Sequence, residues 1–128
     1  MERYENKRLF VNVEEWGGRN RYVTWQLDLL PMIWKNYDLS AMEERIFLLI
    51  CMKYDNAHES KREPLKLSFQ DIADTVNCSI GGVRKAIDNL KYWKLITVIG
   101  ERKGRAKQQY VPNIDHLHNC LKKHLGLS

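Results

Sequence analysis

The stretch DIADTVNCSIGGVRKAI, residues 71–87, decides the predicted fold. It reads as two helical segments joined by a turn, because apolar residues recur at helical spacing on both sides of residues 77–79. Ser79 is a typical N-cap for the second segment. Gly81 and Gly82 stand in the first turn of that second helix, although glycine costs a helix interior roughly 1 kcal/mol relative to alanine.

The two segments match a helix-turn-helix motif. A twenty-residue window for this motif fits residues 69–88, and its positions that face the angle between the helices are apolar or small. Ala73 matters most, because a larger side chain there would push the second helix away. Asn77 occupies the turn position that usually holds glycine, and asparagine is the next best residue for a left-handed backbone. The positions predicted to face the angle are Ile72, Ala73, Val76, Cys78, Val83 and Ala86.

Further predicted elements flank this motif on both sides. Ser40 with Glu43, and Ser68 with Asp71, resemble capping boxes and predict that a helix starts at each place. A strand, a loop and a second strand are predicted in residues 95–112. This order of elements, two helices joined by a turn and then a β-hairpin, is typical of a winged helix-turn-helix.

The two ends of the chain add a predicted β-hairpin and a predicted helix. Residues 8–13 and 21–27 alternate apolar and polar side chains as half-buried strands do, and Gly17, Gly18 and Asn20 between them suit a turn. The predicted fold class is therefore α+β, mainly helical. It is a winged helix-turn-helix in one domain of 128 residues, consisting of an N-terminal hairpin extension (1–36), the core (37–112) and a C-terminal helix (113–128).

Positive charge is concentrated in one part of the chain. The net charge is +5, yet residues 1–78 carry more acidic than basic side chains. Residues 79–110 carry eight Lys and Arg against two Asp and Glu. Such a local positive field predicts a polyanionic partner.

The second helix of the motif, residues 79–93, is predicted to lie in the major groove of duplex DNA. Without side chains at Gly81 and Gly82, backbone N–H groups can approach a phosphate at the positive end of the helix. The alternative is that the glycines only make the helix start mobile. The other predicted contacts on this helix are Arg84 and Lys85, which reach bases or phosphates, Asn89 on the same face, and Ser79, which is first of all a cap.

The hairpin over residues 97–111 is predicted to be a basic wing. A tip of this composition suits the minor groove or the flanking phosphate backbone. The alternative is that charges at a hairpin tip only keep the hairpin from aggregating. The predicted contact residues are Arg102, Lys103, Arg105 and Lys107.

The sequence LSFQDIADTVNCSIGGVRKAIDNLKYWKLITVIGERKGRAKQQYVPN strongly resembles the winged helix-turn-helix superfamily, whose usual ending is matched by Leu90, Trp93, Leu95 and Ile96. The upstream segment YDLSAMEERIFLLICMKYD looks like the first helix of plasmid and phage replication-initiation proteins and of primosomal DnaD-type N-terminal domains. The resemblance covers residues 37–112. It implies a module that binds origin DNA or mediates self-association, often beside a second domain.

The sequence shows no sign of a membrane protein, a disulfide-rich protein, an enzyme or a metal-binding protein. No apolar run is long enough to cross a bilayer and no secretion signal is present, which predicts a soluble, cytoplasmic protein without a membrane partner. Three widely spaced cysteines argue against a disulfide framework. No catalytic or nucleotide-binding motif occurs, so we expect neither an enzyme nor a cofactor. His116, Cys120 and His124 share a predicted helical face, but their spacing matches no familiar zinc module, and no metal is predicted.

The sequence leaves alternatives open for function and partners. The predicted function is non-catalytic binding of double-stranded DNA in replication initiation, and a transcriptional regulator with the same binding mode is the close alternative. A protein-interaction adaptor is the other, because Trp16, Trp25, Trp34 and Trp93 supply aromatic area. The leucine stripe Leu117, Leu121 and Leu125 either packs on its own domain or pairs with a second copy, and a homodimer could form through this C-terminal helix or the N-terminal hairpin.

Overall fold

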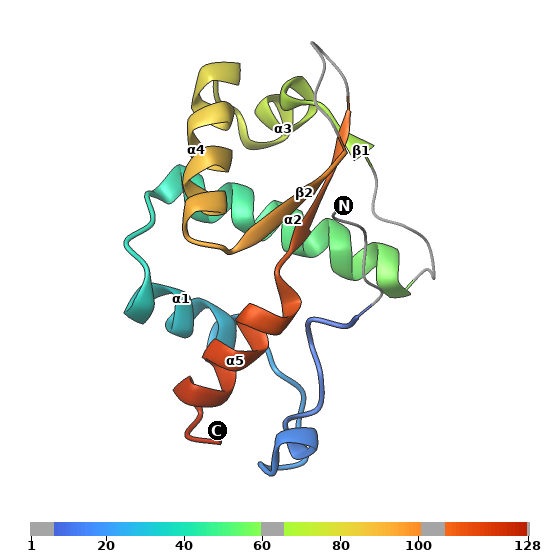
Figure 1. Ribbon diagram of the computed structural model, residues 1–128, viewed down its shortest axis with the longest axis vertical. Helices are drawn as coiled ribbons and strands as arrows, with labels where there is room; N and C mark the ends of the chain where they lie inside the picture. Colours follow the sequence, from blue (N-terminus) through green and yellow to red (C-terminus); the bar gives the residue numbers. More distant parts are fainter. Residues whose placement is uncertain (1–6, 60–65, 101–106, 128) are drawn as a thin grey trace.

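A computed structural model describes residues 7–59, 66–100 and 107–127 of the chain (Figure 1). Two short helical turns come first, a 3-10 turn η1 (Val13–Trp16) and a π-helical turn η2 (Trp25–Leu29). The main elements that follow are α1 (Leu30–Asn36), α2 (Ala41–Glu59), β1 (Lys66–Leu67), α3 (Phe69–Val76), α4 (Ile80–Tyr92), β2 (Ile96–Ile99), β3 (Gln108–Pro112) and α5 (Ile114–His124). The order is that of the predicted winged helix-turn-helix.

Helices α3 and α4 form the predicted helix-turn-helix. Asn77 ends α3 in the left-handed conformation, with φ 58° and ψ 59°, and its N–H donates to the carbonyl of Ala73. This conformation explains why asparagine suits the turn position. The apolar residues predicted to face the interhelical angle are buried, and Cys78 is half-buried. The buried ones are Ile72, Ala73, Val76, Val83 and Ala86.

The wing belongs to a three-stranded antiparallel sheet with the strand order β1-β3-β2. Ile96 pairs with Pro112 and Ile99 pairs with Gln109, so β2 and β3 form a hairpin. Lys66 of β1 pairs with Gln109 on the other side of β3. The predicted wing residues Arg102, Lys103 and Arg105 lie outside the described residues.

Helix α2 is the central support of the winged helix. Ser40 and Glu43 form the predicted reciprocal cap: the Glu43 N–H donates to Ser40 Oγ (3.1 Å), and the Ser40 N–H donates to Glu43 Oε1 (2.9 Å). The helix packs against α3, α4 and β3. Figure 1 shows it crossing the molecule between the two parts of the fold. Its fully buried side chains include Ile46, Phe47 and Ile50.

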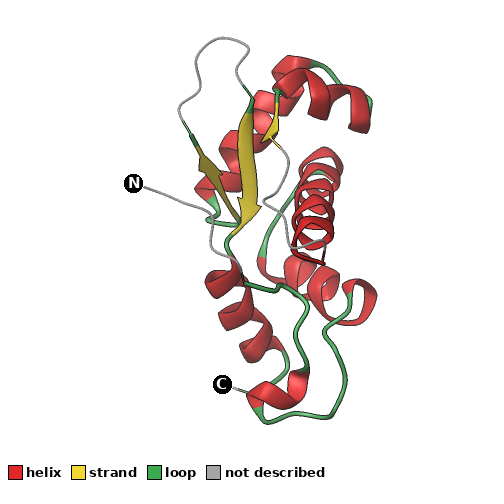
Figure 2. Cartoon of the chain, turned by 90° about the vertical axis from the view of Figure 1, so that its right-hand side faces the viewer, coloured by secondary structure: helices red, strands yellow, loops and turns green. Residues whose placement is uncertain are grey.

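The helices α1 and α5 form a second packing group with η2. They lie below the winged helix in Figure 1, and Figure 2 shows α5 continuing directly from the end of β3. Leu117 and Leu121 are completely buried and Leu125 is half-buried against the core. The leucine stripe thus packs on its own domain, which is the first of the two alternatives for α5. A homodimer through this helix stays a prediction.

The predicted N-terminal β-hairpin is replaced by two short helical turns. The chain does approach itself in an antiparallel manner, because the Val13 N–H donates to the Arg21 carbonyl (2.7 Å) and the Val23 N–H donates to the Val11 carbonyl (2.9 Å). In residues 7–29, however, this pairing is limited to one isolated bridge between residues 12 and 22. The prediction of two strands was wrong in this respect, and a homodimer through this segment stays a prediction.

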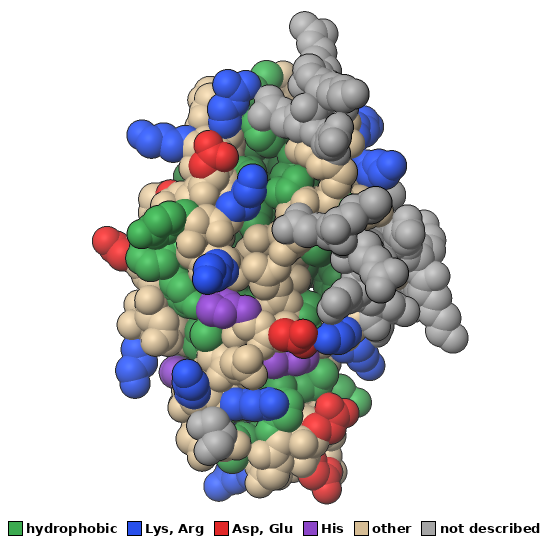
Figure 3. All heavy atoms as spheres, in the orientation of Figure 1, with side chains coloured by type: hydrophobic (Ala, Val, Ile, Leu, Met, Phe, Trp, Pro, Cys, Tyr) green, Lys and Arg blue, Asp and Glu red, His purple; other side chains and the backbone are tan. Residues whose placement is uncertain are grey.

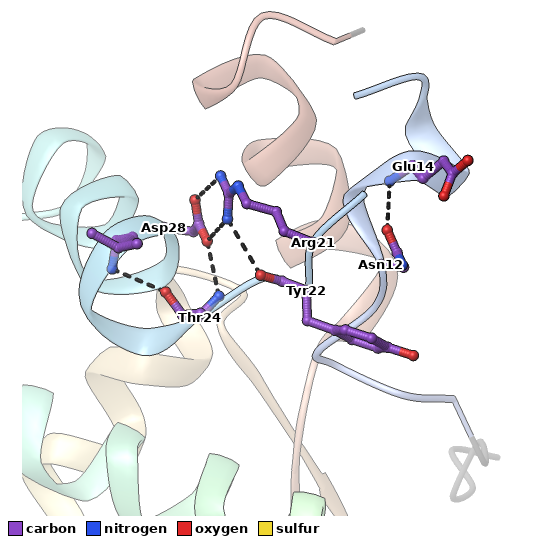
Figure 4. A network of polar contacts seen from close by, with 7 residues as sticks. Asn12, Glu14, Arg21, Tyr22, Thr24 and Asp28 are labelled. Carbon is purple, nitrogen blue, oxygen red and sulfur yellow. Dashed lines mark hydrogen bonds and ion pairs between the residues drawn. The ribbon is translucent and has the colours of Figure 1, made fainter. Parts of the chain in front are cut away.

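Local side-chain bonds explain why strands do not form there. Asn12 Oδ1 accepts a hydrogen bond from the Glu14 N–H (2.9 Å), and Thr24 Oγ1 accepts one from the Leu27 N–H (3.2 Å), so each starts a helical turn (Figure 4). Such bonds compete directly with a strand ladder. The buried carboxylate of Asp28 also accepts the Thr24 N–H at 2.8 Å, which fixes the start of η2.

Gly18 marks a close contact between the two ends of the described chain. A β-carbon at this position would lie 2.4 Å from Val13 Cγ1 and 2.9 Å from Leu127 Cδ1. Both distances are too short for a side chain, so only glycine fits without a shift of its neighbours. The turn after η1 therefore packs closely against the segment that follows α5.

Candidate nucleic-acid interface

The first turn of α4 is the exposed start of the predicted recognition helix. Ser79 is its N-cap, and Ser79 Oγ accepts a hydrogen bond from the Gly82 N–H at 3.0 Å. One face of the helix is buried, through Val83, Ala86, Ile87 and Leu90. The N–H groups that precede Gly82 have no carbonyl four residues back within the helix, as at every helix start. They add partial positive charge to this end.

The two glycines are accessible in this first turn. Gly81 is exposed, and a β-carbon there would meet only Ser79 Oγ, at 4.0 Å. Gly82 is half-buried, and its β-carbon would lie 3.2 Å from Ser79 Oγ and 3.8 Å from Cys78 Sγ. The packing of the chain therefore does not require glycine at position 81. Neither glycine is covered by another part of the fold.

Arg84 and Lys85 follow one turn later, and both are exposed. The guanidinium carbon of Arg84 lies 5.9 Å from the ring centroid of Phe69, the first residue of α3. This is a cation–π contact between the two helices of the motif. Sequence reasoning missed Phe69, because the pairing depends on how α3 crosses α4 and not on a local pattern. Figure 3 shows Lys and Arg side chains projecting where α4 begins, at the upper end of the molecule.

Lys107, immediately before β3, is the one predicted DNA-contact residue of the wing that the structure describes. Its ammonium group lies 3.6 Å from Asp71 Oδ2, and both side chains are substantially exposed. The Asp71 carboxylate also accepts the Ser68 N–H at 2.8 Å, within the capping box that starts α3. Bonds to the Ser68 backbone and side chain, and then the charge of Lys107, hold the pKa of Asp71 below its ordinary value. The first turn of α3 thus contacts two predicted DNA-binding side chains, Arg84 and Lys107.

Among the predicted site residues that the structure describes, Asn89 is the one that does not join this group. Its side-chain amide donates to Glu43 Oε2 at 2.8 Å, and the residue is half-buried. At about 100° per residue Asn89 lies only about 60° from buried Ala86, on the border of the apolar stripe. Its amide therefore connects α4 to the start of α2.

A second polar cluster lies away from α4's first turn, where α5 meets the segment before α2. Tyr37 Oη lies 2.8 Å from His116 Nε2 and 3.6 Å from Cys120 Sγ. Burial, and then the bond to Cys120, raises the pKa of Tyr37. The cluster, formed by described residues, includes no metal site. Within residues 7–59, 66–100 and 107–127, no group of three or more His, Cys, Asp or Glu side chains could hold a metal ion. The same part of the chain contains no helix long and apolar enough to cross a membrane.

The three-helix core, the left-handed turn and the β2–β3 wing define a winged-helix domain of the DNA-binding class. The chain belongs to the family described as Initiator Replication protein, WH1, which matches residues 31–121. The match extends from α1 into α5, whereas η1 and η2 precede it.

The chain is also similar to the crystal structure of adhesin competence repressor (AdcR) from Streptococcus pyogenes. The TM-score is 0.44 and the sequence identity is 18%, over 76% of this chain and 63% of that one. The chain thus spans less than two thirds of the length of the repressor. A search of the curated proteins finds no match.

Proposed function

We propose that this domain binds duplex DNA by placing the first half of α4 in the major groove, as the winged-helix module of a replication initiator. The wing then lies on the flanking phosphate backbone or in the minor groove. One observation carries the proposal: the first turn of α4 is open at Gly81, with exposed Arg84 and Lys85 one turn further along. Backbone N–H groups and two cationic side chains therefore lie on the same exposed face of α4, where a ligand could contact all of them.

Each part of this surface has a chemical role. The N–H groups at the start of α4 suit a phosphate, because the helix dipole favours an anion there. The forked guanidinium of Arg84 suits guanine O6 and N7, whereas Lys85 acts as a point charge on a base or phosphate. Lys107 and the predicted tip residues Arg102, Lys103 and Arg105 add phosphate contacts that position the domain without reading sequence.

Fluorescence-anisotropy titration with duplex DNA over a range of salt concentrations tests the proposal. Arg84→Ala should weaken binding to a preferred duplex by about 1–3 kcal/mol and relax the preference at one base position. Changing both Lys103 and Arg105 to Ala should weaken binding to all duplexes. The double change should also reduce the salt slope by about 0.9 for each phosphate that the variant no longer neutralises.

Lys35→Ala supplies the matched control, because Lys35 is an exposed lysine on α1, away from the start of α4. It should change the affinity far less than Arg84→Ala. If the wild type binds no duplex at low salt, or if Lys35→Ala weakens binding as much as Arg84→Ala, the proposal is overturned. Mapping the bound sites then separates the two roles: sites at an origin indicate an initiator, and sites at promoters indicate a transcriptional regulator.

The adaptor alternative has one favourable observation, which is that Trp34 and Tyr92 are 61% and 75% exposed. Large exposed aromatic side chains are typical anchors in protein interfaces. Two results together would favour the adaptor. Trp34→Ala and Tyr92→Ala would weaken binding to a protein partner, and Arg84→Ala would leave every DNA titration unchanged.

A further inference from the structure

Phe69 and Arg84 connect the two helices of the motif on their exposed side. Phe69 is half-buried at the first position of α3, and Arg84 is exposed on α4. The guanidinium carbon lies 5.9 Å from the ring centroid. A ring at this distance attracts a guanidinium through its quadrupole.

The ring is fixed in place by its surroundings. Ser68 and Asp71, on either side of it in sequence, form the reciprocal capping box of α3, with bonds of 2.8 Å and 3.0 Å. Phe69 also packs against the hydrophobic core. Arg84, in contrast, is a long exposed side chain with many rotamers to lose. A fixed ring next to a mobile cation is a suitable arrangement for restricting that cation.

We infer that Phe69 is a positioning residue for Arg84: its ring holds the guanidinium in a restricted orientation before DNA binds. This inference rests on the proposed function and deepens it, because it says why Arg84 in particular can read a base. Preorganisation lowers the conformational entropy lost on binding. Lys85 is exposed and makes no ring contact among the described residues, so no ring restricts its ammonium group in this way.

NMR spectroscopy of the free protein tests the orientation directly. The ring current of Phe69 should shift the Arg84 Cδ–H and Nε–H resonances, and the shift should disappear in Phe69→Leu. Phe69→Tyr keeps the aromatic face and should keep the shift. Leucine keeps an apolar side chain against the core, and the dispersion of the remaining resonances reports whether the variant is folded. Arg84 resonances that are the same in the wild type and in Phe69→Leu overturn the inference.

A double-mutant cycle tests the consequence for DNA binding. The probe is the duplex most enriched when the wild type selects from a random library, or any duplex of that library if none is enriched. Phe69→Leu should weaken binding about two- to fivefold, which is the effect of one exposed cation–π contact. In an Arg84→Ala background Phe69→Leu should have a clearly smaller effect than in the wild type. With Arg84 present, Phe69→Tyr should bind as the wild type does.

The matched control is the same cycle with Lys85→Ala. Because Lys85 does not contact the ring, the effects of Phe69→Leu and Lys85→Ala should multiply independently. If Arg84→Ala weakens binding but shows no coupling with Phe69→Leu, the inference is overturned while the proposed function stands. If the wild type binds no duplex at all, the proposed function fails and this positioning role fails with it, whatever the resonances show.

Discussion

Arg21 and Asp28, a residue of η2, form a bidentate ion pair. Arg21 Nη1 lies 2.8 Å from Asp28 Oδ2, and Nη2 lies 2.8 Å from Asp28 Oδ1 (Figure 4). The Asp28 side chain is 1% exposed, whereas that of Arg21 is 37% exposed. Removing Arg21 and removing Asp28 should therefore lower the free energy of unfolding by different amounts.

Arg21→Met should destabilise the fold more than Asp28→Asn. The first change leaves a buried carboxylate without its cation and should cost about 3 kcal/mol. The second leaves a guanidinium that water can reach, and should cost about 1–2 kcal/mol. Urea denaturation followed by circular dichroism measures both. Equal losses, or a larger loss with Asp28→Asn, would contradict the burial that the structure gives to Asp28.

The stability of the domain should fall in acid, and Asp28 should account for part of the loss. The bond from Arg21 lowers the pKa of Asp28 in the folded state, against the opposing effect of burial. A lowered folded pKa means that the stabilisation is complete above the ordinary Asp value of about 3.9 and disappears as pH falls through the folded value. Thermal unfolding from pH 6 to pH 2 should therefore show a shallower decline in Asp28→Asn than in the wild type.

Gly81→Ala and Gly18→Ala should change stability in opposite directions. Alanine at position 81 has room and lies in a helix, so it should stabilise the fold by about 0.5–1 kcal/mol. Alanine at position 18 would collide with Val13 and Leu127, so it should destabilise the fold by about 1–3 kcal/mol. If DNA approaches the first turn of α4, Gly81→Ala should also weaken DNA binding despite its greater stability. Melting temperature and anisotropy on the same preparations measure both effects.

Asp71→Asn should strengthen binding to DNA of any sequence while weakening the fold. The change removes a negative charge 3.6 Å from Lys107, so less of the lysine's charge is compensated when phosphates approach. It also removes an acidic group from the first turn of α3, at a cost of about 0.5–1 kcal/mol. The matched control is Asp74→Asn on the same helix, where the carboxylate accepts a hydrogen bond from Gln70. An equal gain in affinity with both variants would mean that only net charge matters.

Asn89→Ala should act on stability and leave DNA affinity nearly unchanged. The amide of Asn89 is bonded to Glu43, so its loss should cost about 0.5–1.5 kcal/mol of unfolding free energy. Glu43→Gln keeps the size of the partner and serves as the comparison. A strong loss of DNA affinity in Asn89→Ala, without a loss of stability, would instead support the predicted DNA contact of Asn89.

The residues of the helix-turn-helix could be predicted because local pattern determines them. Helical spacing places Ile72, Ala73 and Val83 against one another, and the left-handed turn at Asn77 follows from the conformational preference of that residue. The same reasoning failed at residues 8–27, where alternation suggested strands. There, side chains of Asn12 and Thr24 bond to the backbone and start helical turns instead.

The groups of the candidate site on α4 could be predicted from the sequence, but their contacts with other elements could not. Spacing along α4 identified Arg84 and Lys85 as exposed, and the structure agrees. The groups that contact these cations and their neighbours come from other elements: Phe69 beside Arg84, Asp71 beside Lys107, and Glu43 beside Asn89. Such pairings depend on how helices cross, and no local periodicity encodes that.

The contact of Gly18 with Leu127 links two segments that are remote in sequence. Neither segment can separate from the other without exposing apolar surface at both, since α5 also packs on α1 and η2. Backbone amides of η1 and of the last turn of α5 should consequently exchange with deuterium through one shared opening event. The η1 turn and the end of α5 should then open together, as one cooperative unit.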